Sequence, residues 1–124
     1  MTVRIVIPVI NEAGLDAQLS EHFGRTPYFA VVELDEKNQV VNQKTVPNVG
    51  EHFGGSGRRA DFILELRPNV IITYGMGPRG ISIYQDARVA VLRANSNTVR
   101  QVIAAYVKNE LEELTEGCHE ARHP

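Results

Sequence analysis

Near its N-terminus the chain carries Val3-Arg4-Ile5-Val6-Ile7, and this stretch decides the fold. It is rich in β-branched residues and almost continuously apolar, which is typical of a strand covered on both faces of a sheet. Residues 28–34 and 39–46 predict two further strands, and the polar residues 35–38 between them predict a hairpin turn. The first third of the chain is therefore expected to form three strands, with a long loop at residues 11–27.

Helices and strands are expected to alternate in the rest of the chain. Ser56 is suited to cap the first predicted helix and Pro68 ends it, whereas Pro78 stands in the favoured first-turn position of the second. The third helix has the strongest periodicity, because its apolar residues recur at helical spacing. Those residues are Val99, Val102, Ile103, Tyr106 and Val107. Short buried strands are expected at residues 70–74 and 89–92, before and after the second helix, which runs to about residue 86.

The expected order of elements is β-β-β-α-β-α-β-α, which defines an α/β domain. Right-handed crossovers place the three-strand meander beside two parallel strands, and the economical sheet order is 3-2-1-4-5. Chain connections then leave strands 1 and 4 in opposite directions, and ligands of open α/β sheets bind at the carboxyl ends of strands at such a point. Three segments are expected to converge there: residues 11–27, 54–57 and 75–77.

Composition is that of an ordinary globular domain. The chain has 124 residues, 43% of them hydrophobic and 23% charged, and we expect a single domain at residues 1–112 with a flexible tail at 113–124. The formal net charge of -2 argues against nucleic acid and acidic membranes as partners. The single cysteine argues against a disulfide framework and favours the cytoplasm. The apolar N-terminal stretch is too short for a membrane span and lacks a signal-peptide cleavage site.

The tetrapeptide Glu-His-Phe-Gly occurs twice, at residues 21–24 and 51–54, and its two copies hold two of the four histidines. The other two, His119 and His123, stand close to the only cysteine, Cys118. Every imidazole and the thiol are therefore expected in loops or in the C-terminal tail. Since imidazole and thiolate suit iron and related metals, binding of a soft metal centre is the first hypothesis.

Several motifs resemble those of one known family. His22-Phe23-Gly24-Arg25 is followed by Pro27-Tyr28-Phe29, residues 54–57 read Gly-Gly-x-Gly, and an apolar strand precedes Gly75-Met76-Gly77-Pro78. Over about residues 3–108, these motifs resemble in the same order those of the dinitrogenase iron-molybdenum cofactor biosynthesis family. The resemblance implies a ribonuclease-H-like sheet of order 3-2-1-4-5. It also implies a small protein that carries, stores or delivers iron-sulfur or iron-molybdenum cluster precursors.

Four residues are candidate metal ligands: His22, His52, Cys118 and His119. His22 either offers its imidazole to a metal or satisfies a loop carbonyl. His52 is the weaker candidate, because only the first copy of the tetrapeptide carries the family likeness. Cys118 is the best sulfur donor, but a lone cysteine cannot hold a conventional cluster. It is therefore either part of a shared or transient site between two chains or an idle surface thiol.

Candidate cofactor-binding residues come from three segments: Gly24, Arg25, Gly54, Gly55, Ser56, Gly57, Gly75, Met76 and Gly77. A glycine-rich helix start exposes backbone N–H groups suited to an anion, which is either a metal-sulfur cluster or a phosphate. A plain helix-entry turn is the alternative. The segment is not a Walker A loop, because no Gly-Lys-Ser/Thr follows it. Met76 either offers a thioether or covers the pocket with apolar surface.

Two enzyme classes lack support in the sequence. A two-metal nuclease needs carboxylates on strands 1 and 4, and residues 3–7 and 70–74 contain none. Acyl transfer lacks a Gly-x-Ser-x-Gly motif. We therefore expect a non-catalytic protein that binds, stores or delivers an iron-sulfur or iron-molybdenum type cluster. Its expected partners are cluster donor and acceptor proteins, and it is expected as a monomer or weak homodimer. The alternative is a phosphate or nucleotide-ligand binding module that uses residues 54–57.

Overall fold

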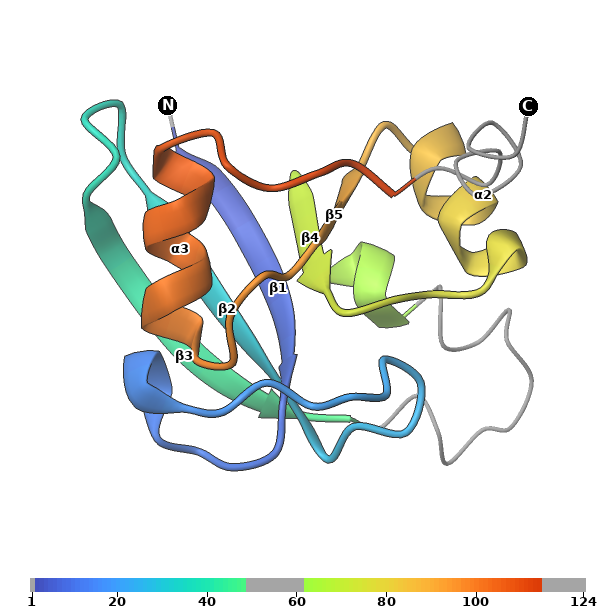
Figure 1. Ribbon diagram of the computed structural model, residues 1–124, viewed down its shortest axis with the longest axis horizontal. Helices are drawn as coiled ribbons and strands as arrows, with labels where there is room; N and C mark the ends of the chain where they lie inside the picture. Colours follow the sequence, from blue (N-terminus) through green and yellow to red (C-terminus); the bar gives the residue numbers. More distant parts are fainter. Residues whose placement is uncertain (1, 49–61, 115–124) are drawn as a thin grey trace.

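Five strands form one mixed sheet in the computed structural model, which describes residues 2–48 and 62–114 (Figure 1). The sheet order is β3-β2-β1-β4-β5, in which β1, β2 and β3 pair antiparallel and β4 joins β1 and β5 in parallel. The strands are β1 (Val3–Val9), β2 (Tyr28–Leu34), β3 (Val40–Pro47), β4 (Val70–Thr73) and β5 (Ala90–Arg93). The predicted α/β class and the predicted order 3-2-1-4-5 are confirmed.

The helices lie on both sides of this sheet. They are the 3-10 helix η1 (Gly14–Asp16), α2 (Pro78–Asp86) and α3 (Val99–Val107). Residues 62–65 are also helical and form the described part of the first predicted helix. Thr98 caps α3, because its side-chain oxygen accepts a hydrogen bond from the backbone N–H of Gln101. The second and third predicted helices are thus found within a residue or two of their expected positions.

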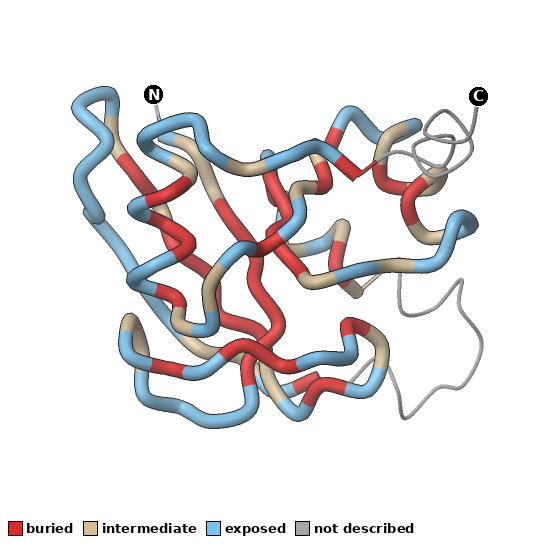
Figure 2. Tube along the Cα trace, viewed as in Figure 1, coloured by how far each residue is buried: buried red, intermediate tan, exposed pale blue. Residues whose placement is uncertain are grey.

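Alternation along β1 sends its side chains into two separate cores. Ile5 and Ile7 are fully buried on one face, where Val99 of α3 packs against the same cluster. Val6 is fully buried on the opposite face, which α2 and residues 62–66 cover. Each such side chain contributes about 1.5–3 kcal/mol through burial. The sheet is therefore the middle of three layers, and Figure 2 shows buried residues concentrated along its central strands.

The long loop after β1 has more structure than its polar composition predicts. Gly14 opens η1 with a φ of 66°, a conformation that favours glycine. Isolated β-bridges then join Leu19 to Val9 and Gln18 to Thr98. The loop is thereby fixed against both the end of β1 and the start of α3. It runs below the carboxyl ends of the central strands in Figure 1.

The edge of β5 is covered by residues 112–114, which include the first two residues of the expected flexible tail. The backbone N–H of Leu114 donates to the carbonyl of Val91 at 2.7 Å, and that of Arg93 donates to the carbonyl of Glu112 at 2.8 Å. Leu114 is buried, and its carbonyl accepts a hydrogen bond from the Gln85 amide at 3.0 Å. The chain thus packs against the sheet as far as residue 114. Because this pairing is antiparallel, it carries the chain toward the start of β5 and away from the carboxyl ends of the strands.

Membrane crossing by a helix needs about 20 consecutive apolar residues. Helices α2 and α3 have nine residues each. Across residues 2–48 and 62–114 no helix is both long and apolar enough to span a bilayer.

Candidate functional site

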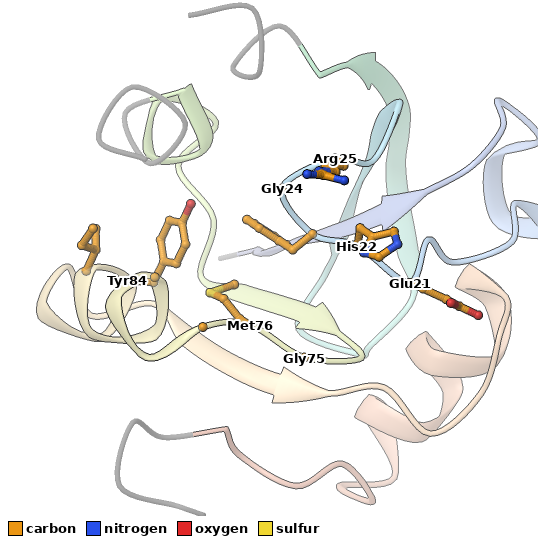
Figure 3. Close-up of a pocket in the computed structure, with 11 residues that line it drawn as sticks. Glu21, His22, Gly24, Arg25, Gly75, Met76 and Tyr84 are labelled. Carbon is orange, nitrogen blue, oxygen red and sulfur yellow. The ribbon is translucent and has the colours of Figure 1, made fainter. Parts of the chain in front are cut away.

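A cavity of about 540 Å³ opens between the loop after β1 and the start of α2. It lies beyond the carboxyl ends of β1 and β4, where the strand order predicts a ligand site. Six of the predicted site residues line it: His22, Gly24, Arg25, Gly75, Met76 and Gly77. Figure 3 shows His22 and Arg25 on one side of the cavity and Met76 and Tyr84 on the other. We call this hollow the Met76 cavity; it is completed by Glu21, Phe23, Gly80, Ile83 and Tyr84.

Three buried polar side chains hold the loop that carries His22 and Arg25. The Ser20 hydroxyl donates to the carbonyl of His22 at 3.1 Å and accepts a hydrogen bond from the backbone N–H of the same residue at 3.2 Å. The Thr26 hydroxyl donates to the carbonyl of Val9 at 2.7 Å. The Asn48 amide donates to the carbonyl of Gly24 at 3.1 Å and to that of Thr26 at 2.9 Å. The loop is therefore tied to both β1 and the end of β3.

Phe23 anchors the same loop in the apolar layer beneath it. Its side chain is only 7% exposed, and its ring centroid lies 5.3 Å from that of Phe29 and 5.9 Å from that of Tyr84. Such tilted and edge-on aromatic pairs are favourable beyond their simple area burial. Because Phe23 points inward, its neighbours His22 and Arg25 are left exposed at the mouth of the cavity.

The opposite wall is built from the segment between β4 and α2. Met76 is half-buried and packs against the apolar cluster on the α2 face of the sheet. Gly75 and Gly77 flank it, and a Cβ added at either glycine would meet no atom within 4 Å. Gly77 and Pro78 begin α2 without a side-chain cap, so the first backbone N–H groups of the helix lack a side-chain partner from the N-cap. These N–H groups form the positive end of the helix dipole at the edge of the cavity.

A second cavity of about 760 Å³ adjoins the first and shares Glu21 and His22 with it. We call it the Tyr74 cavity; its other lining residues are Ile10, Gln18, Leu19, Ser20, Tyr74 and Asn97. The Tyr74 hydroxyl donates to the carbonyl of Ser96 at 3.0 Å. Burial raises the pKa of Tyr74, and the nearby negative charge of Glu21 raises it further. Its lining residues place this cavity between the loop after β1 and the loop before α3.

The described residues of the Met76 cavity supply few soft donor atoms for a metal. His22 offers an imidazole and Met76 a thioether at one cavity, and both suit iron and related metals. Within residues 2–48 and 62–114 no three His, Cys, Asp or Glu side chains are grouped closely enough to hold a metal ion. The remaining predicted site residues lie outside the described residues: His52, Gly54, Gly55, Ser56, Gly57, Cys118 and His119.

Sequence reasoning missed several residues that shape the Met76 cavity. Gly80, Ile83 and Tyr84 come from α2 at helical spacing from Met76 and Gly77, and this spacing is the signal that could have found them. No such signal exists for Asn48, because its amide donates hydrogen bonds to the carbonyls of Gly24 and Thr26, which are far from it in the sequence.

Comparisons with known proteins agree with this architecture. The solved structure of the protein PH0822 is 27% identical, with a TM-score of 0.76 over 90% of this chain and 96% of that one. The apo form of the orange protein from Desulfovibrio gigas is 22% identical, with a TM-score of 0.74 over 90% of this chain and 92% of that one, and it shows the likeness of fold. An uncharacterised protein of Methanocaldococcus jannaschii is 26% identical over 114 residues, which are 90% of this chain and 92% of that protein.

The family comparison covers most of the chain. Residues 4–109 match the family model described as dinitrogenase iron-molybdenum cofactor, and this span includes both walls of the Met76 cavity. The strand order, the position of the cavity and the match over these residues agree, and the chain belongs to the dinitrogenase iron-molybdenum cofactor family.

Proposed function

We propose that the protein binds, stores or delivers an iron-sulfur or iron-molybdenum type cluster, or its precursor, and catalyses no reaction on it. The observation that carries this proposal is the Met76 cavity, where the exposed His22 imidazole and the half-buried Met76 thioether face one opening at the carboxyl ends of β1 and β4. The family name supports the class of cargo. In this role the cluster is a cargo that the protein takes up and passes on, as a substrate is, and not a resident cofactor.

The size and polarity of the cavity suit a compact anionic cargo. Its volume of about 540 Å³ falls within the range of small-ligand sites, which is about 300–1,000 Å³. Arg25 lies at its mouth, and the positive end of α2 lies at its edge. Clusters held by thiolate and sulfide tend to carry negative charge, which these groups would balance. Gly75 and Gly77 leave open space where larger side chains would stand.

The scarcity of donors supports a carrier that releases its cargo. Conventional iron-sulfur clusters are held by four protein ligands, most often cysteine thiolates. The described wall of the Met76 cavity offers one imidazole, one thioether and the carboxylate of Glu21, which points away from Met76, and it offers no thiolate. A cluster bound there would keep other ligands of its own or receive them from outside the described residues. Such partial ligation favours transfer to an acceptor protein over permanent storage.

The proposal is tested by anaerobic reconstitution. The purified protein is offered iron and sulfide, with and without molybdate, and its visible absorption and electron paramagnetic resonance spectra are recorded. We expect a cluster signal in the wild-type protein and a weaker one in His22→Ala. The control is Lys37→Ala, which changes an exposed side chain in the β2–β3 turn.

Two results would count against the proposal. One is the absence of any cluster signal together with stabilisation against heat by inorganic phosphate, which would favour the phosphate-binding alternative. The other is a cluster signal of equal strength in His22→Ala and in the wild-type protein, which would remove His22 from the site while leaving the family membership unchanged.

A further inference from the structure

The Tyr74 cavity has a chemistry that differs from that of the Met76 cavity. Among residues 2–48 and 62–114, no lysine or arginine lines it, whereas Arg25 lines the Met76 cavity. Its charged wall is the exposed carboxylate of Glu21, which Figure 3 shows turned away from Met76 and Tyr84. The two hollows thus share Glu21 and His22, and the Met76 cavity adds an arginine that the described lining of the Tyr74 cavity lacks.

The polar groups around Glu21 mostly accept hydrogen bonds. The Tyr74 hydroxyl already donates its proton to the carbonyl of Ser96, so its oxygen is left as an acceptor. The Asn97 and Gln18 side chains can each turn an amide oxygen toward the hollow. Arg100 on α3 is paired with Asp16 at 3.1 Å and is therefore already engaged. The described lining of the Tyr74 cavity thus holds no lysine or arginine to match these acceptors, and its one imidazole is that of His22.

The rest of the lining is apolar and suits an aliphatic chain. Ile10 is 45% exposed, although it follows directly on the buried strand β1, and Leu19 forms part of the wall beside it. Lysine and arginine side chains commonly lay their methylene stem on apolar surface while the charged end reaches a polar partner. The exposed Ile10 suits the methylene stem of such a side chain, and the Glu21 carboxylate with its neighbouring acceptors suits the charged end.

We propose that the Tyr74 cavity receives a lysine or arginine side chain of a partner protein, with its stem on Ile10 and its charged end beside Glu21. This inference rests on the proposed function, because a cluster carrier must dock with a donor or acceptor protein close to its cargo. A side chain seated here would bring the partner to the Glu21–His22 peptide, which both cavities share. A third hollow, lined by Asn95, Ser96 and Gln101 among others, continues from Tyr74 and Asn97 and leaves room for flanking residues of the partner.

The test is a titration of the isotope-labelled, cluster-free protein with the peptide Ac-Ala-Lys-Ala-NH2, followed by amide chemical shifts. We expect shifts at Ile10, Glu21 and Asn97. We expect Glu21→Gln to lower the affinity for the peptide roughly two- to fivefold, as for loss of one solvent-exposed ion pair. The matched control is Glu12→Gln, which removes an exposed carboxylate of the same loop outside the cavity and should leave affinity unchanged.

Two further ligands make the outcome decisive. The same peptide with norleucine in place of lysine keeps the stem and loses the charge, and equal binding of this peptide would overturn the proposal. Butylammonium chloride supplies the charge and stem without a peptide backbone. If it binds as tightly as the lysine peptide, the cavity recognises a free amine and the assignment to a partner protein is wrong. Because no cluster is present in this titration, its result is independent of whether cluster uptake succeeds.

Discussion

The thioether of Met76 lies directly over the backbone of Gly80. A Cβ added at Gly80 would lie 3.0 Å from the Met76 sulfur and 3.1 Å from its Cγ, closer than real Cβ atoms usually approach. Gly80 stands in the first turn of α2, and both residues line the same cavity. The absence of a side chain at Gly80 therefore leaves the space in which the sulfur of Met76 rests.

Replacing Gly80 by alanine should displace Met76 while leaving the fold intact. Alanine favours a helix over glycine by about 0.5–1 kcal/mol, and this gain offsets part of the strain of moving a flexible side chain. We expect a changed methyl resonance of Met76, one of only two methionines, with a free energy of unfolding within about 1 kcal/mol of wild type. Gly75→Ala is the control, since its Cβ would meet no atom within 4 Å. An unchanged Met76 methyl resonance in Gly80→Ala would contradict the relationship.

Asn48 should govern the order of the His22 loop although it lies outside the cavity. Its side chain is buried, and Asn48→Ala leaves the carbonyls of Gly24 and Thr26 without their amide donor. We expect a loss of about 1–3 kcal/mol in the free energy of unfolding, measured by urea denaturation. Faster hydrogen exchange is expected at residues 22–25. Asn11→Ala, which removes one exposed hydrogen bond in the same long loop, should cost within about 0.5 kcal/mol. Equal losses of unfolding free energy in the two variants would show that Asn48 does not hold the His22 loop in place.

Most of the fold could be predicted because its signals are local. The apolar run at Val3-Arg4-Ile5-Val6-Ile7 identified the central strand, and the crossover rules then left one economical place for β4 and β5. The spacing of Val99, Val102 and Ile103 identified α3, and all three residues are buried. The pairing of residues 112–114 with β5 could not be predicted in this way. One buried leucine in an acidic stretch shows no hydrophobic periodicity that would indicate a strand.

The site was predicted in part, for a physical reason. His22, Arg25 and Met76 could be placed together because the carboxyl ends of β1 and β4 are neighbours in a sheet of order 3-2-1-4-5. The approach of Met76 to Gly80 depends on the rotamer of the methionine side chain. The hydrogen bonds of the Asn48 amide to the His22 loop depend on where β3 ends beside that loop. Neither leaves a pattern in the sequence. The prediction that His52 lies beside the cavity stays a prediction, as this residue is outside the described ranges.

The hydrogen bonds that Glu33 accepts from Asn42 and Arg4 should make stability depend on pH in acid. The hydrogen bond from Asn42, and then that from Arg4, lower the pKa of Glu33 from its ordinary value of 4.5. Since the folded-state pKa lies below the unfolded one, the carboxylate stabilises the fold above pH 4.5, and this contribution is lost as pH falls through the folded-state pKa.

Urea denaturation of wild type and Glu33→Gln across this range checks that direction. We expect the wild-type protein to be the more stable above pH 4.5 and the difference to shrink at lower pH. Glu12→Gln again supplies an exposed carboxylate for comparison. A difference that stays constant through the acid range would contradict the role of Glu33.

Tyr74 should report directly on the charge of Glu21. Its pKa is raised above the ordinary value of 10.0, first by burial and second by the Glu21 carboxylate. Glu21→Gln removes only the second cause, so the pKa of Tyr74 should fall and yet remain above 10.0. Titration of tyrosine ring carbons by nuclear magnetic resonance measures this, with Tyr74→Phe to assign the signal. Glu12→Gln should leave the Tyr74 titration unchanged. If Glu21→Gln also leaves it unchanged, the carboxylate does not face the phenol, and the acceptor-lined wall of the Tyr74 cavity loses its charged member.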